Sequence, residues 1–415
     1  MDNEEWSYVP AQDFCLKVTD GTHDSPKRKE EGKYLITSKH IKERSIDYSS
    51  AYLISEEEYE KINQRSRVDQ WDVLISMIGE YCGFCYIERE KQINYAVKNV
   101  GIFKAGTKIK AEWIYYYLNS MEGKNLLSAL KRGTSQPYLS LGSLRNLPIR
   151  IYKDDGYMHN IVLTLSCLDD KIELNNRINK VLEEMARAIF KSWFVDFEPF
   201  QDREFEDSEL GKIPKGWKAG TISDLGEITG GSTPSKAKNE YFSNNGIAWI
   251  TPKDLSINKN KFISKGEIGI TELGLKNSST KIMPKGTVLF SSRAPIGYIA
   301  IAKNELTTNQ GFKSVVPKKN IGTAYIYYYL KSNVKLIESR ASGSTFKEVS
   351  GSIMKSIPAL IPDDNILIDF NKICYQCFEK QMLLENENMI LTNIRDSLLP
   401  KLMSGEIRVP VEEVQ

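Results

Sequence analysis

An internal repeat limits this chain to folds built from two similar halves. The pentapeptide Ile-Tyr-Tyr-Tyr-Leu occurs at 114–118 and again at 326–330, a separation of 212 residues in a chain of 415. Neighbouring segments repeat in the same order, at shifts between 210 and 215 residues. The further matched pairs are 18–22 with 228–232, 35–41 with 249–255, 72–74 with 287–289, 133–135 with 343–345, and 147–148 with 357–358. Matches that keep their order at a nearly constant shift indicate a tandem duplication.

Each copy opens with a segment of mixed α+β character. Short runs of β-branched and aromatic residues, at 34–41 and 72–78 and again at 246–255 and 286–292, are separated by Gly, Asn, Ser and Pro. Such runs predict strands joined by turns, and the pentapeptide predicts an amphipathic helix. Because three successive tyrosines of a helix point in different directions, part of each triplet must belong to the core.

Each copy ends with a long helical segment. Between 161 and 194 there is no proline or glycine, and apolar residues recur at spacings of three and four, with Asn175 and Asn179 in the same stripe. In the second copy Phe370, Cys377, Leu384, Leu391 and Leu398 are each seven apart. Sustained heptads predict a coiled coil, and two such helices in one chain can pair with each other. The alternative is ordinary burial against a globular domain, but polar residues inside the stripe favour a coiled coil whose register they set.

The predicted organisation is therefore a globular module at 1–155, a helix at 156–200, a second module at 201–364 and a second helix at 365–415. A helix over 161–194 is about 50 Å long at ~1.5 Å per residue. Two similar modules on so long a rod suit a ligand that has two separated sites.

Composition leaves the class of ligand open. The net charge is +2, from 56 basic and 54 acidic residues, which neither supports nor excludes a nucleic acid as a partner. Mean hydropathy is −0.39, and no run of 18 apolar residues predicts a membrane span. The first ten residues are acidic and lack an apolar stretch, so we expect no secretory signal and a cytoplasmic protein.

The familiar motifs of catalysis are missing. The sequence has no GxGxxG, no GxxxxGK[ST], no GxSxG and no HExxH, and its three histidines do not cluster. The Asn/Asp-Pro-Pro-aromatic tetrapeptide of amino-methylating enzymes is also absent. Two CxxC pairs, Cys82/Cys85 and Cys374/Cys377, are compatible with zinc or redox chemistry. Their wide separation and apolar surroundings favour buried hydrophobic cysteines. We expect a non-catalytic chain without a metal or cofactor of its own.

Several motifs resemble one known family over essentially the whole length. In the second copy they are Ile213-Pro214-Lys215-Gly216-Trp217, 231–235 (GSTPS), 247–251 (IAWIT), Ser291-Ser292-Arg293 and 308–312 (TNQGF). The helical segments end in 188–197 (AIFKSWFVDF) and 398–407 (LLPKLMSGEI), and the first copy carries Asp20-Gly21-Thr22-His23 followed by Pro26. With this layout the chain resembles the specificity subunits (HsdS) of type I restriction-modification systems.

The resemblance implies a function in DNA recognition. Each module would be a target recognition domain that reads one half of a bipartite, asymmetric site in double-stranded DNA, and the two helices would form an antiparallel coiled coil that spans the unread spacer. Two DNA methyltransferase subunits would dock on the helices, and restriction/translocase subunits would join for cleavage. S-adenosylmethionine, ATP and Mg²⁺ would belong to those partners. The alternative is a protein-interaction scaffold of the same architecture without DNA readout.

Candidate DNA-binding residues are chosen in each module for side chains of the right chemistry. Base edges are read by Arg, Lys, Asn, Gln, Ser and Thr, whereas lysines and backbone amides hold phosphates. In the first module the candidates are Thr22, His23, Lys27, Arg28, Lys39, Ser135 and Gln136. In the second module they are Thr233, Lys236, Thr251, Lys253, Arg293, Asn309, Gln310, Ser344 and Thr345.

Each candidate also has a structural interpretation. Arg293 is either a bidentate guanine reader or a salt-bridge partner, and Asn309-Gln310 either reads adenine or closes a turn. The run that begins Lys27-Arg28 either contacts phosphates or is a solvated loop. His23 is either a DNA contact or a hydrogen-bonding loop residue. The tyrosine triplets can stack on bases wherever they are not core.

Overall fold

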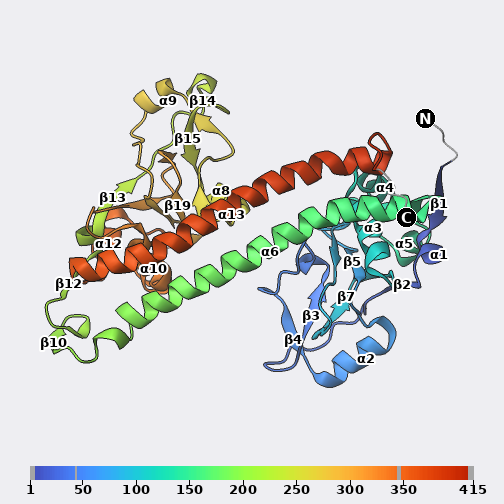
Figure 1. The fold of residues 1–415 in the computed structure, drawn as a ribbon, viewed down its shortest axis with the longest axis horizontal. Helices are drawn as coiled ribbons and strands as arrows, with labels where there is room; N and C mark the ends of the chain where they lie inside the picture. The colour runs from blue at the N-terminus through green and yellow to red at the C-terminus, as the bar shows by residue number, and fades with distance from the viewer. Residues whose placement is uncertain (1–4, 43, 344–346, 410–415) are drawn as a thin grey trace, which may run out of the picture. The chain divides into compact units, whose positions relative to one another are not determined.

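The computed structural model describes residues 5–42, 44–343 and 347–409. It divides into two compact units, of which unit 1 comprises 1–172 and 390–415 and unit 2 comprises 173–389. The long helices α6 (Asp155–Phe194) and α13 (Asp364–Ser404) contribute residues to both units. Figure 1 shows these elements along the chain.

Unit 1 is built around a four-stranded antiparallel sheet. Its order is β2 (Lys17–Asp20), β8 (Val100–Lys104), β5 (Asp72–Ser76), β6 (Cys85–Ile87). All five residues of β5 are buried because both faces of this strand are covered. Val73 and Ile75 pack into a core with helix α3 (Lys108–Asn119), whereas Leu74 packs into a second core with the strands of another sheet.

That other sheet has the order β4 (Tyr52–Ile54), β3 (Lys33–Thr37), β7 (Tyr95–Lys98), with β3 parallel to β7. The strands β1 (Trp6–Pro10) and β9 (Pro148–Tyr152) form a separate antiparallel pair. The remaining helices of the module are α1 (Ala11–Phe14), α2 (Glu56–Ser66), α4 (Met121–Leu130) and α5 (Leu141–Arg145), with the 3-10 turn η1 (Ser38–His40).

Unit 2 repeats this plan, which confirms the duplication. Its main sheet has the order β13 (Gly226–Gly230), β21 (Lys313–Pro317), β18 (Val288–Ser292), β19 (Ile296–Ala302), extended by β16 (Phe262–Ile263). The parallel pair recurs as β15 (Ile247–Ile250) with β20 (Thr307–Thr308), and the outer pair as β12 (Lys218–Thr221) with β22 (Pro358–Ile361). Helices α10 (Thr323–Ser332), α11 (Val334–Ser339) and α12 (Gly351–Lys355) follow in the same order as α3, α4 and α5.

Short elements complete unit 2. They are η2 (Glu198–Phe200), β10 (Phe205–Ser208), β11 (Gly211–Pro214), α7 (Ile222–Leu225), η3 (Asn239–Tyr241), β14 (Phe242–Ser243), α8 (Pro252–Ile257), β17 (Gly269–Ile270) and α9 (Glu272–Lys276).

Within each unit the two long helices lie side by side and run antiparallel (Figure 1). In unit 2, Asn175 Nδ2 donates to Asn388 Oδ1 at 2.9 Å, and Phe194 stacks edge-to-face on Phe370 at 5.0 Å, so that rising numbers on α6 face falling numbers on α13. In unit 1, Arg395 Nη1 donates to Asp169 Oδ1 at 2.5 Å. Asn175 is fully buried and also bonds Glu387, as expected for a polar residue that sets the register.

Helix α6 begins earlier than its proline- and glycine-free stretch indicates. It starts at Asp155 and tolerates Gly156 in its first turn, where the Asp154 side chain accepts a hydrogen bond from the Gly156 amide at 2.8 Å. This capping contact satisfies a backbone donor that the helix itself leaves free. Helix α13 likewise continues through Pro400 near its end.

All six tyrosines of the repeated pentapeptide are buried. The middle tyrosine of each copy bonds a carboxylate on α6: the Tyr116 hydroxyl donates to Asp169 Oδ2 at 2.8 Å and the Tyr328 hydroxyl to Glu183 Oε2 at 3.0 Å. The pentapeptide therefore seats each module on a long helix, and its burial leaves no ring available for stacking on bases.

All six cysteines are free thiols. Cys82, Cys85 and Cys374 are buried free thiols, and burial raises the pKa of Cys85 to about 12. Among the described residues no group of His, Cys, Asp and Glu has the arrangement of a metal site. In the described part of the chain no helix combines the length and apolarity needed to cross a membrane.

Glu112 on α3 is a buried carboxylate in unit 1. Its side chain is fully buried, and its nearest cations are Lys108 at 3.7 Å and Arg89 at 3.8 Å. Burial raises its pKa to about 7, although both cations oppose the shift. In an unfolded chain the pKa of a glutamate is about 4.3. The folded state therefore binds more protons between these two pH values, and the contribution of Glu112 to stability falls as the pH rises through this window.

We predict that Glu112→Gln becomes more stable relative to the parent chain, by about 1–3 kcal/mol, as the pH rises from 5 to 8, because the variant has no carboxylate to ionise. Urea unfolding at both pH values measures the difference, and Glu56→Gln, an exposed carboxylate on α2, is the control. Parallel pH curves for the parent and Glu112→Gln would contradict the prediction.

Candidate nucleic-acid interface

Four loops meet at one end of the main sheet in unit 1. They are the loop after β2 (21–25), the turn before β8 at Asn99, the loop after β5 (77–79) and the hairpin 132–138. His23 joins the first two loops, with Nδ1 2.8 Å from Asn99 Oδ1 and Nε2 3.0 Å from Asp20 Oδ2. Ile78 and Tyr138 join the other two through an antiparallel bridge.

A pocket of about 280 Å³ lies where these loops meet. It is lined by Asp20, His23, Met77, Ile78, Asn99, Tyr138, Leu139, Ser140 and Leu141. The loop after β2 lies so close to β7 that position 21 requires glycine, because a Cβ there would lie 2.2 Å from the Val97 carbonyl oxygen. The Ser38 hydroxyl, next to Lys39, bonds the Asn99 carbonyl and accepts from the Met77 and Ile78 amides at 3.0 and 3.1 Å.

The same four loops meet in unit 2 with different side chains. Gly231 again allows close approach, since a Cβ would lie 2.2 Å from the Asn309 carbonyl oxygen. Thr233 Oγ1 donates to Gln310 Oε1 at 2.5 Å, joining the first loop to the turn before β21. Arg293 Nη1 lies 3.3 Å from Glu348 Oε2, joining the loop after β18 to the hairpin that starts at Ser342.

Four of the nine predicted residues of the second module, Thr233, Arg293, Asn309 and Gln310, lie at these loops. Asn309 Oδ1 accepts a hydrogen bond from the Gly311 amide at 2.9 Å, so this side chain closes its own turn, as the alternative interpretation had it. Gln310 is exposed. The start of α8 lies beside the turn, because the Asn309 amide donates to the Ile250 carbonyl at 3.0 Å.

The other predicted residues of this module serve several roles. Thr251 is the N-cap of α8 and its hydroxyl donates to Asp254 Oδ2 at 2.6 Å. Lys253 is exposed and pairs with Glu267 at 2.6 Å, and this hydrogen bond raises the pKa of the lysine. Lys236 is exposed. Ser344 and Thr345 lie outside the described residues.

In the first module the predicted residues divide into two groups. Thr22 and His23 lie at the meeting loops, and Ser135 and Gln136 are exposed on the hairpin 132–138. Lys39 is exposed on η1, next to Ser38, whose hydroxyl bonds two of these loops. The segment with Lys27 and Arg28 is exposed and is tied instead to β4, because the Lys29 amide donates to the Leu53 carbonyl at 2.8 Å. Thr22 Oγ1 accepts from the Asp24 amide at 3.1 Å, which shapes the loop.

Sequence reasoning missed several residues at the loops. Ile78, Tyr138 and Asn99 in unit 1 and Lys313 and Glu348 in unit 2 were not candidates. Glu348 lies between two cations, 3.3 Å from Arg293 and 3.3 Å from Lys313 Nζ. The only available signal was the position of Glu348 beside the predicted pair Ser344 and Thr345.

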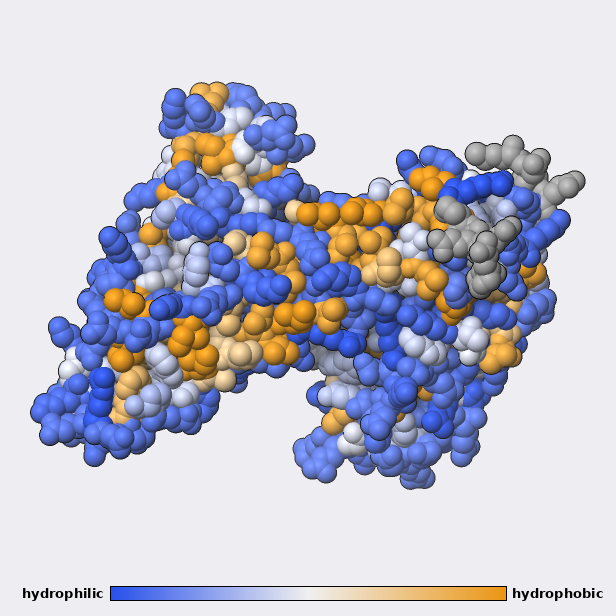
Figure 2. Space-filling view, in the orientation of Figure 1, coloured by the Kyte–Doolittle hydropathy of each residue, from blue (hydrophilic) through white to orange (hydrophobic). Residues whose placement is uncertain are grey.

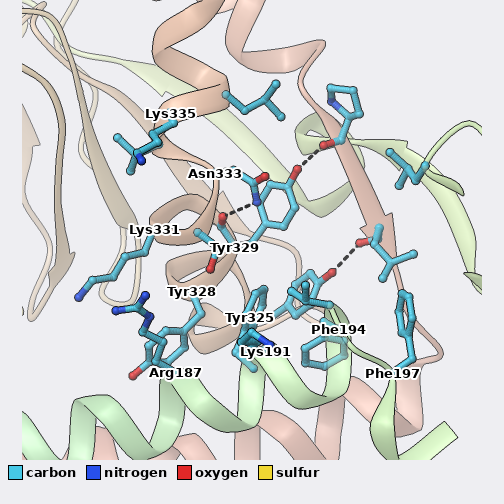
Figure 3. Close-up of a pocket in the computed structure, with 18 of the residues that line it drawn as sticks. Arg187, Lys191, Phe194, Phe197, Tyr325, Tyr328, Tyr329, Lys331, Asn333 and Lys335 are labelled. Atoms are coloured by element: carbon cyan, nitrogen blue, oxygen red, sulfur yellow. Dashed lines mark hydrogen bonds between the residues drawn. The ribbon is translucent and has the colours of Figure 1, made fainter. Parts of the chain in front are cut away.

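A second candidate surface is a groove of about 1120 Å³ in unit 2, between α6, α10 and α11 (Figure 3). Its floor is aromatic, and several cations stand at its edge. The floor includes Phe190, Phe194, Tyr325, Tyr328 and Tyr329, and the cations are Arg187, Lys191, Lys331, Lys335 and Arg340. The floor is held in place by the hydrogen bonds from Tyr325 Oη to the Leu360 carbonyl at 2.7 Å and from Asn333 Nδ2 to the Tyr329 carbonyl at 2.8 Å.

Apolar side chains are also exposed along the long helices, and Figure 2 shows hydrophobic residues gathered over them. In unit 2 the exposed residues are Leu174, Val181, Met185, Ile368, Ile373, Tyr375, Leu383 and Met389. In unit 1 they are Leu163, Ile390 and Ile394. Exposed apolar rows on paired helices are typical of surfaces that bind other helices.

Comparison with known proteins bears on these surfaces. A family model described as a type I restriction modification DNA specificity domain matches residues 3–184 and 214–380, one match in each half of the chain. The MjaIX specificity subunit of Methanocaldococcus jannaschii is 47% identical over 163 residues, which cover 39% of this chain and 38% of that protein. The HindI specificity subunit of Haemophilus influenzae is 27% identical over 408 residues, covering 83% of this chain and 88% of that protein.

The fold also matches a solved structure. The crystal structure of the type I restriction-modification S subunit from M. genitalium superposes with a TM-score of 0.56 over 97% of each chain, at 18% identity. At this level of identity the match supports the fold, with its two tandem modules and two long helices.

Proposed function

Because this chain belongs to the family of type I restriction-modification DNA specificity subunits, we propose that it recognises a bipartite, asymmetric site in double-stranded DNA and docks methyltransferase and restriction subunits. Each module would read one half-site. S-adenosylmethionine, ATP and Mg²⁺ would be bound by the partners, the chain itself would be non-catalytic, and the complex would act in the cytoplasm.

The observation that carries DNA recognition is the pair of four-loop surfaces. Both modules place the same four loops at the same end of the same sheet. The side chains there differ: His23 with Asn99 and Ile78 with Tyr138 in one module, Thr233 with Gln310 and Arg293 with Glu348 in the other. A shared scaffold with different polar and apolar groups on the loops suits two readers of different base sequences.

The exposed apolar rows on α6 and α13 support partner docking. Helices of a methyltransferase subunit that packed on these rows would bury them. The groove of unit 2 is lined in part by α6 and has an aromatic floor with cations at its edge. Such a groove suits a segment of a partner protein that carries apolar and acidic side chains.

One observation favours the alternative of a scaffold without DNA readout. Arg293 and Lys253 are already paired with carboxylates of their own module. Surface ion pairs contribute only about 0–1 kcal/mol, however, so DNA phosphates and base edges can compete with these pairs.

The direct test is selection from a randomised duplex library by the chain in complex with its methyltransferase subunits. We expect enrichment of two different half-sites separated by an unread spacer of fixed length. Arg293→Glu and Lys253→Glu should each weaken binding, whereas a scaffold would be indifferent to both. A library without any enriched bipartite motif would contradict the proposal.

For the predicted phosphate contacts, we expect that Lys27→Ala with Arg28→Ala makes the salt dependence of DNA binding shallower. Each lost phosphate contact lowers the slope of log K against log salt by about 0.9, so the pair should lower it by roughly 1.8. Mobility shifts of the complex at several salt concentrations measure the slope. The base sequence that is selected should stay the same, and an unchanged slope would show that this segment is only a solvated loop.

For docking, we expect that Leu383→Glu on α13 abolishes co-purification with the methyltransferase subunit, because a carboxylate would have to be buried in an apolar contact. Leu273→Glu, at a leucine of α9 that is 48% exposed where Leu383 is 60% exposed, is the matched control. Gel filtration of the mixed subunits measures complex formation, and intact complex with Leu383→Glu would place the docking surface elsewhere.

A further inference from the structure

Two facing positions at the loops are equivalent in the two modules. In unit 1 the Leu139 amide donates to the Met77 carbonyl at 2.8 Å, so Ile78 lies across from Tyr138. In unit 2 the Val349 amide donates to the Ser292 carbonyl at 3.0 Å, so Arg293 lies across from Glu348. In both modules the second residue also pairs within its own hairpin, Tyr138 with Arg132 and Glu348 with Ser342. The two modules thus share these backbone contacts, and the chemistry of the facing pair differs.

The pair in unit 2 is charged and accessible. The Arg293 and Glu348 side chains are each 37% exposed, and only Nη1 of the guanidinium engages the carboxylate, at 3.3 Å. Within the described residues no hydrogen bond occupies Nη2 or Nε of Arg293. The planar fork of an arginine can therefore still donate two parallel hydrogen bonds to the O6 and N7 atoms of guanine.

The negative charge of Glu348 is offset by neighbouring cations, so its carboxylate can lie close to DNA. Lys313 Nζ holds its other oxygen at 3.3 Å and is only 16% exposed, so Glu348 keeps one cation when Arg293 turns to a base. The three groups together carry one net positive charge, which removes the repulsion that a lone carboxylate would meet from phosphates. A carboxylate in this position can accept a hydrogen bond from the N4 amino group of cytosine.

Hydrogen bonds from Ser291 fix the backbone of the loop that carries Arg293. Ser291 is fully buried, its hydroxyl donates to the Pro295 carbonyl at 2.7 Å, and it accepts from the Tyr298 amide at 2.8 Å. These bonds close the segment on both sides of Arg293. A fixed backbone lowers the entropy lost when an arginine engages a base.

The pair in unit 1 is uncharged and consists of an aliphatic side chain, Ile78, and an aromatic ring with a hydroxyl, Tyr138. Ile78 and Tyr138 line the pocket together with Met77, Leu139 and Leu141, and Tyr138 is 40% exposed. Of the polar residues that share the pocket, Asp20 and Asn99 each bond His23, and Ser140 bonds Ser143. The apolar group that DNA offers in its major groove is the methyl of thymine.

We propose that these two facing positions form a base-reading pair in each module. Arg293 and Glu348 select a G·C base pair, and Ile78 and Tyr138 select an A·T pair through the thymine methyl group. This inference rests on the proposed function, and it names the residues that make the two half-sites different at equivalent places.

The test uses the complex with methyltransferase subunits and a randomised duplex library. With Arg293→Ala, the preference for G·C should fall about 5- to 150-fold at one position of one half-site. Arg293→Lys keeps the charge but lacks the fork, so it should lose the same preference while retaining the salt dependence of binding. The exchange of Arg293→Ile with Glu348→Tyr should turn that single position toward A·T.

Two controls accompany these variants. Arg203→Ala removes an arginine of similar exposure, 43%, from a similar ion pair with Asp363 at 3.2 Å, away from the four loops, and should leave the selected motif unchanged. The half-site read by the first module is an internal control in every selection, and its enrichment also shows that each variant is folded and assembled.

The outcomes separate the inference from the proposed function. If the unmodified complex enriches no bipartite motif, both fail. If it does enrich one, and Arg293→Ala weakens binding evenly over all sequences or leaves every base preference intact, the base-reading pair is overturned while DNA recognition stands.

Discussion

The structure depends on the packing of one aromatic helix in each module against the paired long helices. In unit 2, Tyr325 and Tyr328 of α10 pack with Phe190 and Phe194 of α6 and with Phe370 of α13. Aromatic rings bury large areas and hold fixed mutual angles, so this cluster fixes the seat of the module. The hydroxyls of Tyr116 and Tyr328 complete the seat by bonding carboxylates of α6. This requirement explains why the tyrosine triplet is identical in two copies whose loops differ.

Because the aromatic helix fixes each module on the long helices, the loops can differ between the modules without changing the fold. The order of four strands in the main sheet, the parallel strand pair and the order of the following helices are the same in both modules, and each set of four loops leaves the same end of its sheet. Glycine occurs in both modules where the backbone is most crowded, at Gly21 and Gly231. At the other loop positions the two modules carry different side chains. The fold therefore separates a constant part, which fixes the geometry of each module, from a variable part that suits recognition.

The sequence predicted the constant part well and the variable part only in outline. Duplication, strand runs and heptads depend on local spacing, and the structure confirms the two modules and the antiparallel helices. Facing pairs such as Ile78 with Tyr138 join loops that are 60 residues apart, and no local pattern indicates which residues will meet. For the same reason the sequence did not show that Arg293 shares Glu348 with Lys313. Thr251, by contrast, opens a local capping pattern with Pro252 and Asp254, so its place at the start of a helix was predictable from the sequence. The DNA-binding roles of the candidate residues remain predictions.

The central claim, that the two sets of four loops are the DNA-reading surfaces, is tested most directly by hydrogen–deuterium exchange. The complex with methyltransferase subunits would be compared with and without a duplex that carries its selected motif. Slower exchange upon DNA addition is predicted for 21–25 and 132–138 in the first module and for 231–233 and 309–311 in the second, with no change in the hairpin of β10 and β11. Unchanged exchange in these loops, with protection confined to other surfaces, would contradict the account.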